Sequence, residues 1–321
     1  MLHLLKEQGY DITNEEHEAD AAVVNTCCFI HDAKEESVNT ILELADLKRT
    51  ARLKALIVTG CLAQRYQKEI QEEIPEVDAI LGAANIDDIA AVVGEALGGK
   101  KMICSRDIQY LPKGLTDRLV TTGTAMAYLK IAEGCSKYCT YCIIPYLRGH
   151  YRSIPMEEIL ETAGKLAAAG YKELVLVAQE TTLYGQDLYG EKRLPQLLEA
   201  LSRIDGIRWL RLLYCYPEEI TDELIQTMAE NPKICHYIDM PIQHSEDEIL
   251  KAMGRRTTRR QILDVIRRLR TAMPDLVLRT TLITGFPGET REQHEALLQF
   301  VDETEFERLG VFPYSPEEGT K

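Results

Sequence analysis

The sequence is poor in basic residues: 37 lysines and arginines stand against 51 aspartates and glutamates, giving a formal net charge of −14. Proteins that bind nucleic acid usually carry a basic footprint, so this balance argues against direct nucleic-acid binding and suits a basic protein partner. No apolar stretch approaches the roughly 20 residues that cross a bilayer, and no basic region with a cleavage site opens the chain. We therefore expect neither a membrane span nor a secretory signal.

Cysteine is present but not in a pattern typical of disulfides. Nine cysteines are scattered along 321 residues, and an odd, scattered set does not indicate a disulfide framework. Thiols stay reduced in the cytoplasm, which is the setting we expect for this protein. The length predicts about two domains.

The first hundred residues predict an α/β domain. Compact apolar strands alternate with helical patterns, an arrangement typical of a doubly wound parallel sheet with crossover helices. We expect this domain over residues 1–100 and a linker, with room for a short edge strand, over residues 101–124. The predicted strands are 21–26, 55–60 and 78–82, and the predicted helices are 31–49, 62–73 and 85–97.

A second and longer series begins at residue 125 and extends to residue 321. Six apolar strands alternate with five helical patterns, which suits a partial (β/α)6 barrel. In barrels of this kind the chemistry lies at the carboxyl ends of the strands. The predicted strands are 127–134, 173–179, 208–214, 237–243, 276–284 and 308–314.

The run GCSKYCTYC at residues 134–142 follows the first of these strands. It places Cys135, Cys139 and Cys142 in a Cys-x3-Cys-x2-Cys array, with Tyr141 before the last cysteine. Three thiolates on one loop can bind three irons of a 4Fe-4S cube and leave the fourth iron open to a small molecule. The partner that this spacing suggests is S-adenosylmethionine. A structural zinc site is the alternative, but zinc normally takes four ligands and no fourth follows nearby.

The ends of the other strands carry polar and glycine residues that are candidates for cofactor binding. Gln179 ends the second strand and Gln243 the fourth, where it could contact a ligand or only cap the strand. In the GFPGE turn, Gly285 and Gly288 would let backbone approach a ligand closely, or would only form a strand-to-helix turn. Arg279 lies inside the fifth strand, where it must either pair with an acid or reach into the barrel and hold a carboxylate.

The remaining cysteines and an arginine-rich segment have less specific patterns. Cys27 and Cys61 each follow a strand of the first domain, so adjacent parallel strands would bring them together. Two thiols are too few for a cluster, and small core residues are an equally good interpretation. We expect Cys104, Cys215 and Cys235 to be packing residues. The arginines of segment 255–270 are best interpreted as a solvated helix face.

The chain resembles the radical S-adenosylmethionine methylthiotransferases over nearly its whole length. Within that family it is most similar to the branch that modifies an aspartate of small-subunit ribosomal protein S-twelve. Relatives that act on transfer RNA typically have LLGQNVNSY where this chain has VAQETTLYG, which favours the ribosomal-protein branch. The resemblance is carried by ADAAVVNTCCFIHDAKEES, GCLAQRY, YLKIAEGCSKYCTYCIIPYLRGHYRS, VAQETTLYGQDLYG, RLLYCYPEEITDELI, YIDMPIQHSEDEILKAMGRRTT, LRTTLITGFPGET and RLGVFPYSPEEGT.

The resemblance implies a chemistry. The cluster on Cys135, Cys139 and Cys142 would reduce bound S-adenosylmethionine, and the resulting deoxyadenosyl radical would take a hydrogen from the β-carbon of the target aspartate. A second 4Fe-4S cluster, with Cys27 and Cys61 as two of its ligands, would carry the sulfur. A further S-adenosylmethionine would supply the methyl group. A flavodoxin or ferredoxin type of protein would donate electrons. The alternatives are a transfer-RNA methylthiotransferase and a non-catalytic iron–sulfur protein.

The chain departs from the family pattern at both ends. A first strand ending in a motif like SLGCxKNxVDSE, with the third ligand of the second cluster, has no counterpart before MLHLLKEQGY. The C-terminal β-barrel that follows SPEEGT in the family has none either. Cys28 neighbours Cys27 on an extended segment and should point the other way, so we do not expect it to substitute as a ligand.

A first prediction follows from this departure. Because the radical cluster has its three cysteines and the second cluster lacks one, anaerobic reconstitution should load about four irons per chain. The measurement is an iron count on the desalted protein. A stable content of about eight irons per chain would contradict it.

Overall fold

The computed structural model describes residues 1–112, 117–121 and 123–321, so part of the predicted linker lies outside the described residues. Contacts divide the chain into two compact units, and each unit is described by itself. We call them the N-terminal unit and the barrel unit. The N-terminal unit comprises Met1–Leu119, Cys142–Gly149 and Ser315–Lys321, and the barrel unit comprises Val120–Tyr141 and His150–Tyr314.

The N-terminal unit is built on a four-stranded parallel sheet. Its strand order is β1-β2-β3-β4, with β1 at one edge. Three strands lie where the alternating pattern predicted them, and β4 is the short edge strand expected in the linker region. The strands are β1 (Ala21–Thr26), β2 (Ala55–Gly60), β3 (Ala79–Leu81) and β4 (Met102–Cys104).

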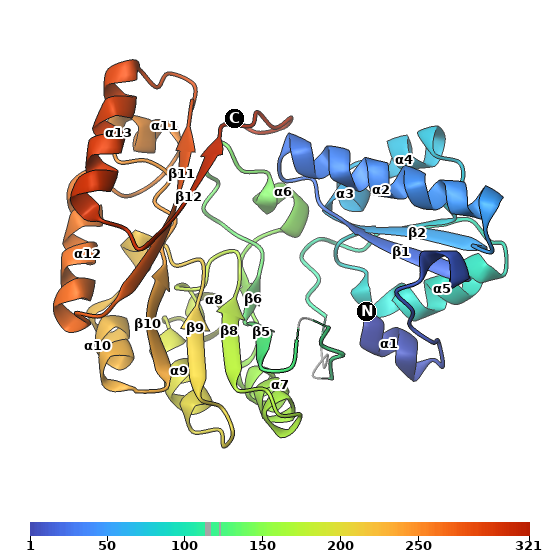
Figure 1. Cartoon of the computed structure of the whole chain (residues 1–321), viewed down its shortest axis with the longest axis horizontal. Helices are drawn as coiled ribbons and strands as arrows, with labels where there is room; N and C mark the ends of the chain where they lie inside the picture. The colour runs from blue at the N-terminus through green and yellow to red at the C-terminus, as the bar shows by residue number, and fades with distance from the viewer. Residues whose placement is uncertain (113–116, 122) are drawn as a thin grey trace. The chain divides into compact units, whose positions relative to one another are not determined.

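Helices cover both faces of this sheet (Figure 1), as the prediction of a doubly wound domain required. On one face α2 (His31–Thr50) packs through Ile41 and Leu44 against β2. On the other face α1 (Leu2–Glu7) and α5 (Ile89–Leu97) pack against the same strands. The predicted helix 62–73 is interrupted at Tyr66, giving α3 (Cys61–Arg65) and α4 (Gln67–Glu73); the short helix α6 (Ile144–Arg148) also belongs to this unit.

The barrel unit contains the six-stranded parallel sheet that the sequence predicted. Its order, β12-β11-β10-β9-β8-β5, follows the chain, so each strand lies beside its predecessor in the series. β5 and β12 stand at the two ends of that order, as in a partial barrel. The strands are β5 (Met126–Lys130), β8 (Glu173–Val177), β9 (Trp209–Leu212), β10 (Ile234–Asp239), β11 (Val277–Thr284) and β12 (Arg308–Pro313).

Five longer helices lie on the outer side of the barrel sheet (Figure 1). Alternate strand residues such as Leu129, Leu176 and Leu212 are fully or almost fully buried beneath them. The helices are α7 (Met156–Ala168), α9 (Leu194–Ser202), α10 (Asp222–Glu230), α12 (Arg259–Ala272) and α13 (Arg291–Thr304), with short α8 (Gln186–Tyr189) and α11 (Asp247–Ala252) between them. Across the described ranges, no helix combines the length and apolarity needed to cross a membrane.

Four predicted strands end at least two residues earlier than the apolar pattern indicated: those over 127–134, 173–179, 208–214 and 237–243. The strand predicted over 127–134 divides: after β5, the pair β6 (Ala132–Glu133) turns aside and joins β7 (Arg152–Ser153) antiparallel. The strand predicted over 237–243 ends at Asp239, because Pro241 has no N–H to donate to a ladder. Gln243, with φ of 72°, makes only an isolated bridge to Leu282.

The covered face of the barrel sheet generates a prediction about stability. Leu176→Ala should destabilise the protein by roughly 2–5 kcal/mol, because it removes a fully buried side chain and leaves a cavity. Leu188→Ala on α8 is the matched control, since Leu188 is 44% exposed. Denaturant unfolding of both variants checks this. Equal losses in the two variants would show that the sheet face is not the core.

Candidate functional site

The three-cysteine loop, residues 134–142, begins where β6 leaves the sheet. The N–H of Gly134 donates to Oε1 of Gln179 at 2.8 Å, and Nε2 of Gln179 donates to Glu133 Oε1 at 3.1 Å. Gly134 has φ of 80°, which a side chain would strain. The amide of Gln179, at the end of β8, therefore holds the start of the loop.

The far part of the loop is held by α11. The N–H and the hydroxyl of Thr140 donate to the carbonyls of Met253 and Ala252, each at 2.9 Å. Gly254 follows with φ of 72°, and a Cβ there would lie 3.5 Å from the Thr140 nitrogen. Tyr141 packs in a small apolar cluster with Met253 and Phe286. The loop is thus attached to the barrel unit near both of its ends.

The cysteines differ in exposure. Cys135 and Cys139 are buried, 5% and 6% exposed, and Cys142 is half-buried. Burial raises the pKa of Cys135 to about 11, so its thiol stays protonated at neutral pH unless a cation replaces the proton. Among the described residues, no three His, Cys, Asp or Glu side chains are gathered as a metal site. The donor chemistry of three thiols on one loop nevertheless fits a cluster with one open iron.

A group of buried charges surrounds the middle of the loop. Lys137 is 7% exposed, and its Nζ lies 3.1 Å from Glu218 Oε1, 4.0 Å from Glu180 Oε2 and in contact with Glu219. Its ammonium also lies 5.0 Å from the ring centroid of Tyr216. The sequence prediction did not select Lys137, because a lysine between cysteines gives no signal of burial.

Glu180 is the fully buried carboxylate of this group. Its Oε1 accepts a hydrogen bond from the Thr182 N–H at 2.9 Å, while Oε2 has no hydrogen-bond partner among the described residues. Burial raises the pKa of Glu180 to about 8. The sequence signal for Glu180 was a charged residue directly after an apolar strand. The sequence prediction instead chose the preceding residue, Gln179, as the cofactor-binding candidate.

Arg255 belongs to the same group and differs from the arginines that follow it. It is 7% exposed, donates to the Pro241 carbonyl at 2.7 Å and lies over the Tyr216 ring, 4.3 Å from its centroid. The later Arg267 and Arg268 of α12 form exposed or half-exposed ion pairs. The interpretation of segment 255–270 as a solvated helix face is therefore wrong for Arg255.

The GFPGE turn is organised by Glu289. Its Oε2 accepts from the N–H groups of Gly285 and Phe286, the latter at 3.1 Å, and its Oε1 lies 3.4 Å from Nε2 of buried His244. Gly285 and Gly288 have φ of 71° and 91°, and no described atom lies within 4 Å of a Cβ built at either. The turn therefore leaves backbone uncovered, as close approach by a ligand requires.

Two further predicted cofactor residues are tied to neighbouring strands. Arg279 pairs with Asp239, its register partner in β10, which is 1% exposed. Of the two roles considered for Arg279, the structure shows pairing with an acid. Gln243 is 9% exposed, and its backbone bonds Thr281 and Ile283 of β11 at 2.9 and 2.8 Å. Gln243 has φ of 72° and lies four residues beyond Asp239, the last residue of β10.

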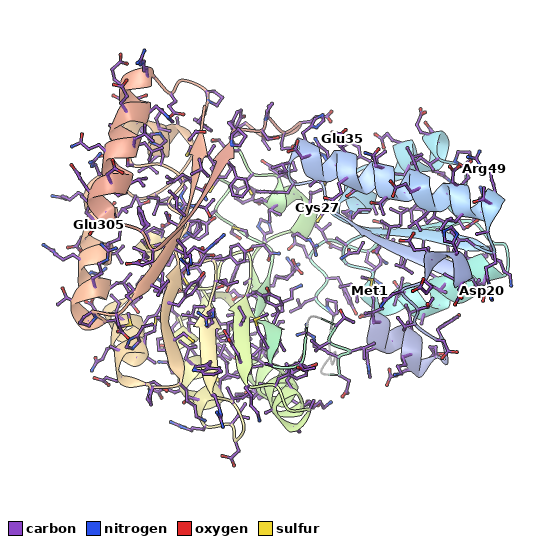
Figure 2. All side chains as sticks on the ribbon, in the orientation of Figure 1. Met1, Asp20, Cys27, Glu35, Arg49 and Glu305 are labelled. Carbon is purple, nitrogen blue, oxygen red and sulfur yellow. The ribbon has the colours of Figure 1, made fainter. Side chains whose placement is uncertain are left out.

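The cysteines of the N-terminal unit lie at the ends of β1 and β2. Thr26 and Gly60 are register partners, so Cys27 and Cys61 occupy the next positions of adjacent strands. Figure 2 shows Cys27 at the opposite end of β1 from Asp20. Cys27 is exposed, whereas Cys28 is fully buried in the same apolar cluster as Cys61.

Two arginines approach these buried thiols. Nε of Arg148 donates to the sulfur of Cys61 at 3.3 Å. Burial, with the neighbouring Cys61, raises the pKa of Cys28 to about 11, although Arg65 acts in the opposite direction. Cys215, expected to be a packing residue, is fully buried in the barrel core.

The chain matches two family models. Residues 129–301 match the radical SAM superfamily, and residues 1–82 match an uncharacterized protein family designated UPF0004. The parallel partial barrel with its three-cysteine loop therefore defines a radical SAM enzyme.

Curated relatives show which family of radical SAM enzymes the chain belongs to. A protein of Lachnoclostridium phytofermentans is 59% identical over all of this chain and 73% of its own length, and one of Desulforamulus reducens is 53% identical over all of this chain and 72% of its own. Both are named ribosomal protein uS12 methylthiotransferase RimO. This chain belongs to that family. It is a transferase, a radical SAM methylthiotransferase that uses a 4Fe-4S cluster and S-adenosylmethionine.

Solved structures with little sequence identity share the fold. The radical S-adenosylmethionine methyltransferase TsrM from Kitasatospora setae aligns with a TM-score of 0.65 at 15% identity, covering 92% of this chain and 63% of that one. The cobalamin-dependent S-adenosylmethionine radical enzyme OxsB aligns with a TM-score of 0.59 at 13% identity, covering 91% and 44%. These likenesses confirm the α/β architecture.

The buried carboxyl of Glu180 generates a prediction about pH. With a pKa of about 8, it keeps its proton in the folded protein at pH values where the unfolded chain has lost it. Folded molecules then bind more protons, so stability falls as pH rises from about 5 to about 8. Glu180→Gln should remove this slope and gain roughly 3 kcal/mol relative to the parent between pH 5.5 and 8.

Denaturant unfolding of the parent and the variant at several pH values checks this expectation. Glu230→Gln, on the exposed side of α10, is the control and should follow the parent at every pH. Parallel stability profiles for the parent and Glu180→Gln would show that Glu180 ionises normally in the fold.

Proposed function

We propose that this enzyme adds a methylthio group to the β-carbon of an aspartate in ribosomal protein uS12, the S-twelve protein of the small subunit. The observation that carries the proposal is the buried pair Cys135 and Cys139, on a loop attached at both ends beside the carboxyl edge of the barrel sheet. The relatives named for this activity cover the whole chain.

Cys135, Cys139 and Cys142 would hold the radical-SAM cluster as thiolates. When bound, that group supplies the electron that cleaves S-adenosylmethionine. The chain's own residues orient and shield it: Gln179 and Thr140 fix the backbone of the loop, and burial keeps water from the thiols. The uncovered GFPGE backbone offers space for the nucleoside or amino-acid part of the cofactor.

The N-terminal unit offers two ligands for a second 4Fe-4S cluster, too few to hold it firmly, in line with the expected content of about four irons per chain. Cys27 and Cys61 would be two of its ligands, because they follow register-paired residues at the ends of β1 and β2. The hydrogen bond from Nε of Arg148 would orient the Cys61 sulfur. Cys27 is exposed, so it would have to turn inward to join Cys61.

The substrate and partners follow from charge and sequence. A chain with a net charge of −14 is electrostatically suited to a basic ribosomal protein. The segment VAQETTLYG, from 177 to 185, favours this substrate over transfer RNA, the second candidate. We further infer a cytoplasmic setting and an electron donor of the flavodoxin or ferredoxin type, since the cluster must be reduced.

The test of this function is an anaerobic assay with two substrates. The reconstituted protein should cleave S-adenosylmethionine to 5′-deoxyadenosine but transfer methylthio groups poorly. The groups that it does transfer should appear on an aspartate of uS12, as seen by peptide mass spectrometry, and not on transfer RNA. Cys135→Ala should lower cleavage by about two orders of magnitude, because the cluster loses a ligand.

The control variant is Cys104→Ala, which changes a half-buried thiol of β4 outside the proposed ligand set and should retain activity. Methylthiolation of transfer RNA instead of uS12 would replace the proposed substrate. Full cleavage activity in Cys135→Ala would show that Cys135 is not a ligand of the cluster.

A further inference from the structure

Lys137 is the only charged residue in the three-cysteine loop, and it lies between Cys135 and Cys139. Its side chain is buried, although the ends of lysine side chains usually reach water. A buried ammonium persists in a protein only when it is paired and hydrogen-bonded. The residues around Lys137 therefore decide what it contributes.

Besides Glu180, which lies 4.0 Å away after β8, the partners of Lys137 come from one short segment. Glu218 and Glu219 belong to the 3-10 turn η3 (Pro217–Glu219) that follows β9, and both carboxylates contact the ammonium. Tyr216, the residue before that turn, presents its ring to the same group at 5.0 Å. Lys137 thus connects the middle of the loop to the segment that follows β9.

Glu218 and Glu219 depend on Lys137 to different degrees for the neutralisation of their charge. Glu219 has a second cation, because Nζ of Lys192 lies 2.7 Å from its other oxygen. Glu218 forms its ion pair with Lys137, and the buried guanidinium of Arg255 also acts on it electrostatically. Lys192 lies outside the loop, so it offers a matched comparison: both lysines neutralise Glu219, and only one is joined to the cysteines.

Two contacts hold the centre of the loop: Ser136 Oγ accepts from the N–H of Tyr151 at 3.1 Å, and the buried side chain of Lys137 forms its ion pairs. Gln179 holds Gly134 and α11 holds Thr140, while Tyr138 adopts φ of 54°, an unfavourable conformation for a residue with a side chain. A strained segment persists when its surroundings hold it. Among the described contacts, the ion pairs of Lys137 are the buried ones at that point.

We propose that Lys137 is a positioning residue that holds the centre of the three-cysteine loop against the η3 turn, keeping the Cys135 and Cys139 thiols buried and oriented as ligands. The role as ligands rests on the proposed function; the protection of the two thiols does not. Lys137 acts through the loop and touches no reacting atom.

The test uses the full chain in its reduced, metal-free form. Iodoacetamide labelling, followed by peptide mass spectrometry, gives the alkylation rate of each cysteine separately. In Lys137→Met, Cys135 and Cys139 should react about tenfold faster than in the parent, because the loop opens locally. In Lys192→Met both rates should stay within about twofold of the parent.

Two internal references separate local opening from unfolding. Cys27 is exposed and should react quickly in every variant, and Cys215 is fully buried in the barrel core and should stay protected. If Lys137→Met also exposes Cys215, that variant has unfolded more widely. The double variant Lys137→Met with Glu218→Gln then tests whether the loss of Lys137 opens the loop alone. It removes one charge of each sign and leaves the Glu219–Lys192 pair intact.

The double variant should keep Cys215 protected and still expose Cys135 and Cys139. Parental protection of both thiols in that folded variant would overturn the proposal, since Lys137 would then only neutralise Glu218. After anaerobic reconstitution, the same variant should lose iron to a chelator about tenfold faster than Lys192→Met. A parent protein that binds no iron would refute the proposed function, while the labelling rates would still decide the role of Lys137.

Discussion

The site depends on one constraint, the attachment of a short loop at the edge of a parallel sheet. Strands of a parallel sheet end together at one edge, so the end of β8, the turn after β9 and the helix after β10 lie within reach of the loop that follows β6. The amide of Gln179 and the carbonyl of Met253 bond its backbone. Two of its three thiols, Cys135 and Cys139, are buried before any metal binds, which limits both solvent access and the set of possible ligands.

The fold could be predicted from the sequence because its strongest signals are local. Apolar strands such as 55–60 and 173–177 alternate with helices of ordinary length, and this alternation indicates parallel α/β units. The spacing of Cys135, Cys139 and Cys142 is equally local, and it indicated both the class of cofactor and the place of the site. The motifs shared with the methylthiotransferases then indicated the family, which the relatives confirm.

The rest could not be predicted because it depends on tertiary partners. Arg279 has an acid beside it only because β10 and β11 pair in the register that places Asp239 there. Lys137 is buried because η3 brings two carboxylates to it from about eighty positions away. Arg255 looks the same as its neighbours in an arginine-rich segment, yet it lies over the Tyr216 ring and donates to the Pro241 carbonyl. The spacing of residues along the sequence does not indicate any of these three tertiary contacts.

The central claim is that this loop presents one iron of a 4Fe-4S cube to S-adenosylmethionine. Electron paramagnetic resonance of the reduced, oxygen-free protein, recorded with and without S-adenosylmethionine labelled in its methionine carboxylate and amino group, tests it most directly. The account predicts a cubane signal that shifts on addition of the cofactor and shows magnetic coupling to the labelled atoms. A cluster signal that is unchanged by the cofactor, with no coupling, would contradict it.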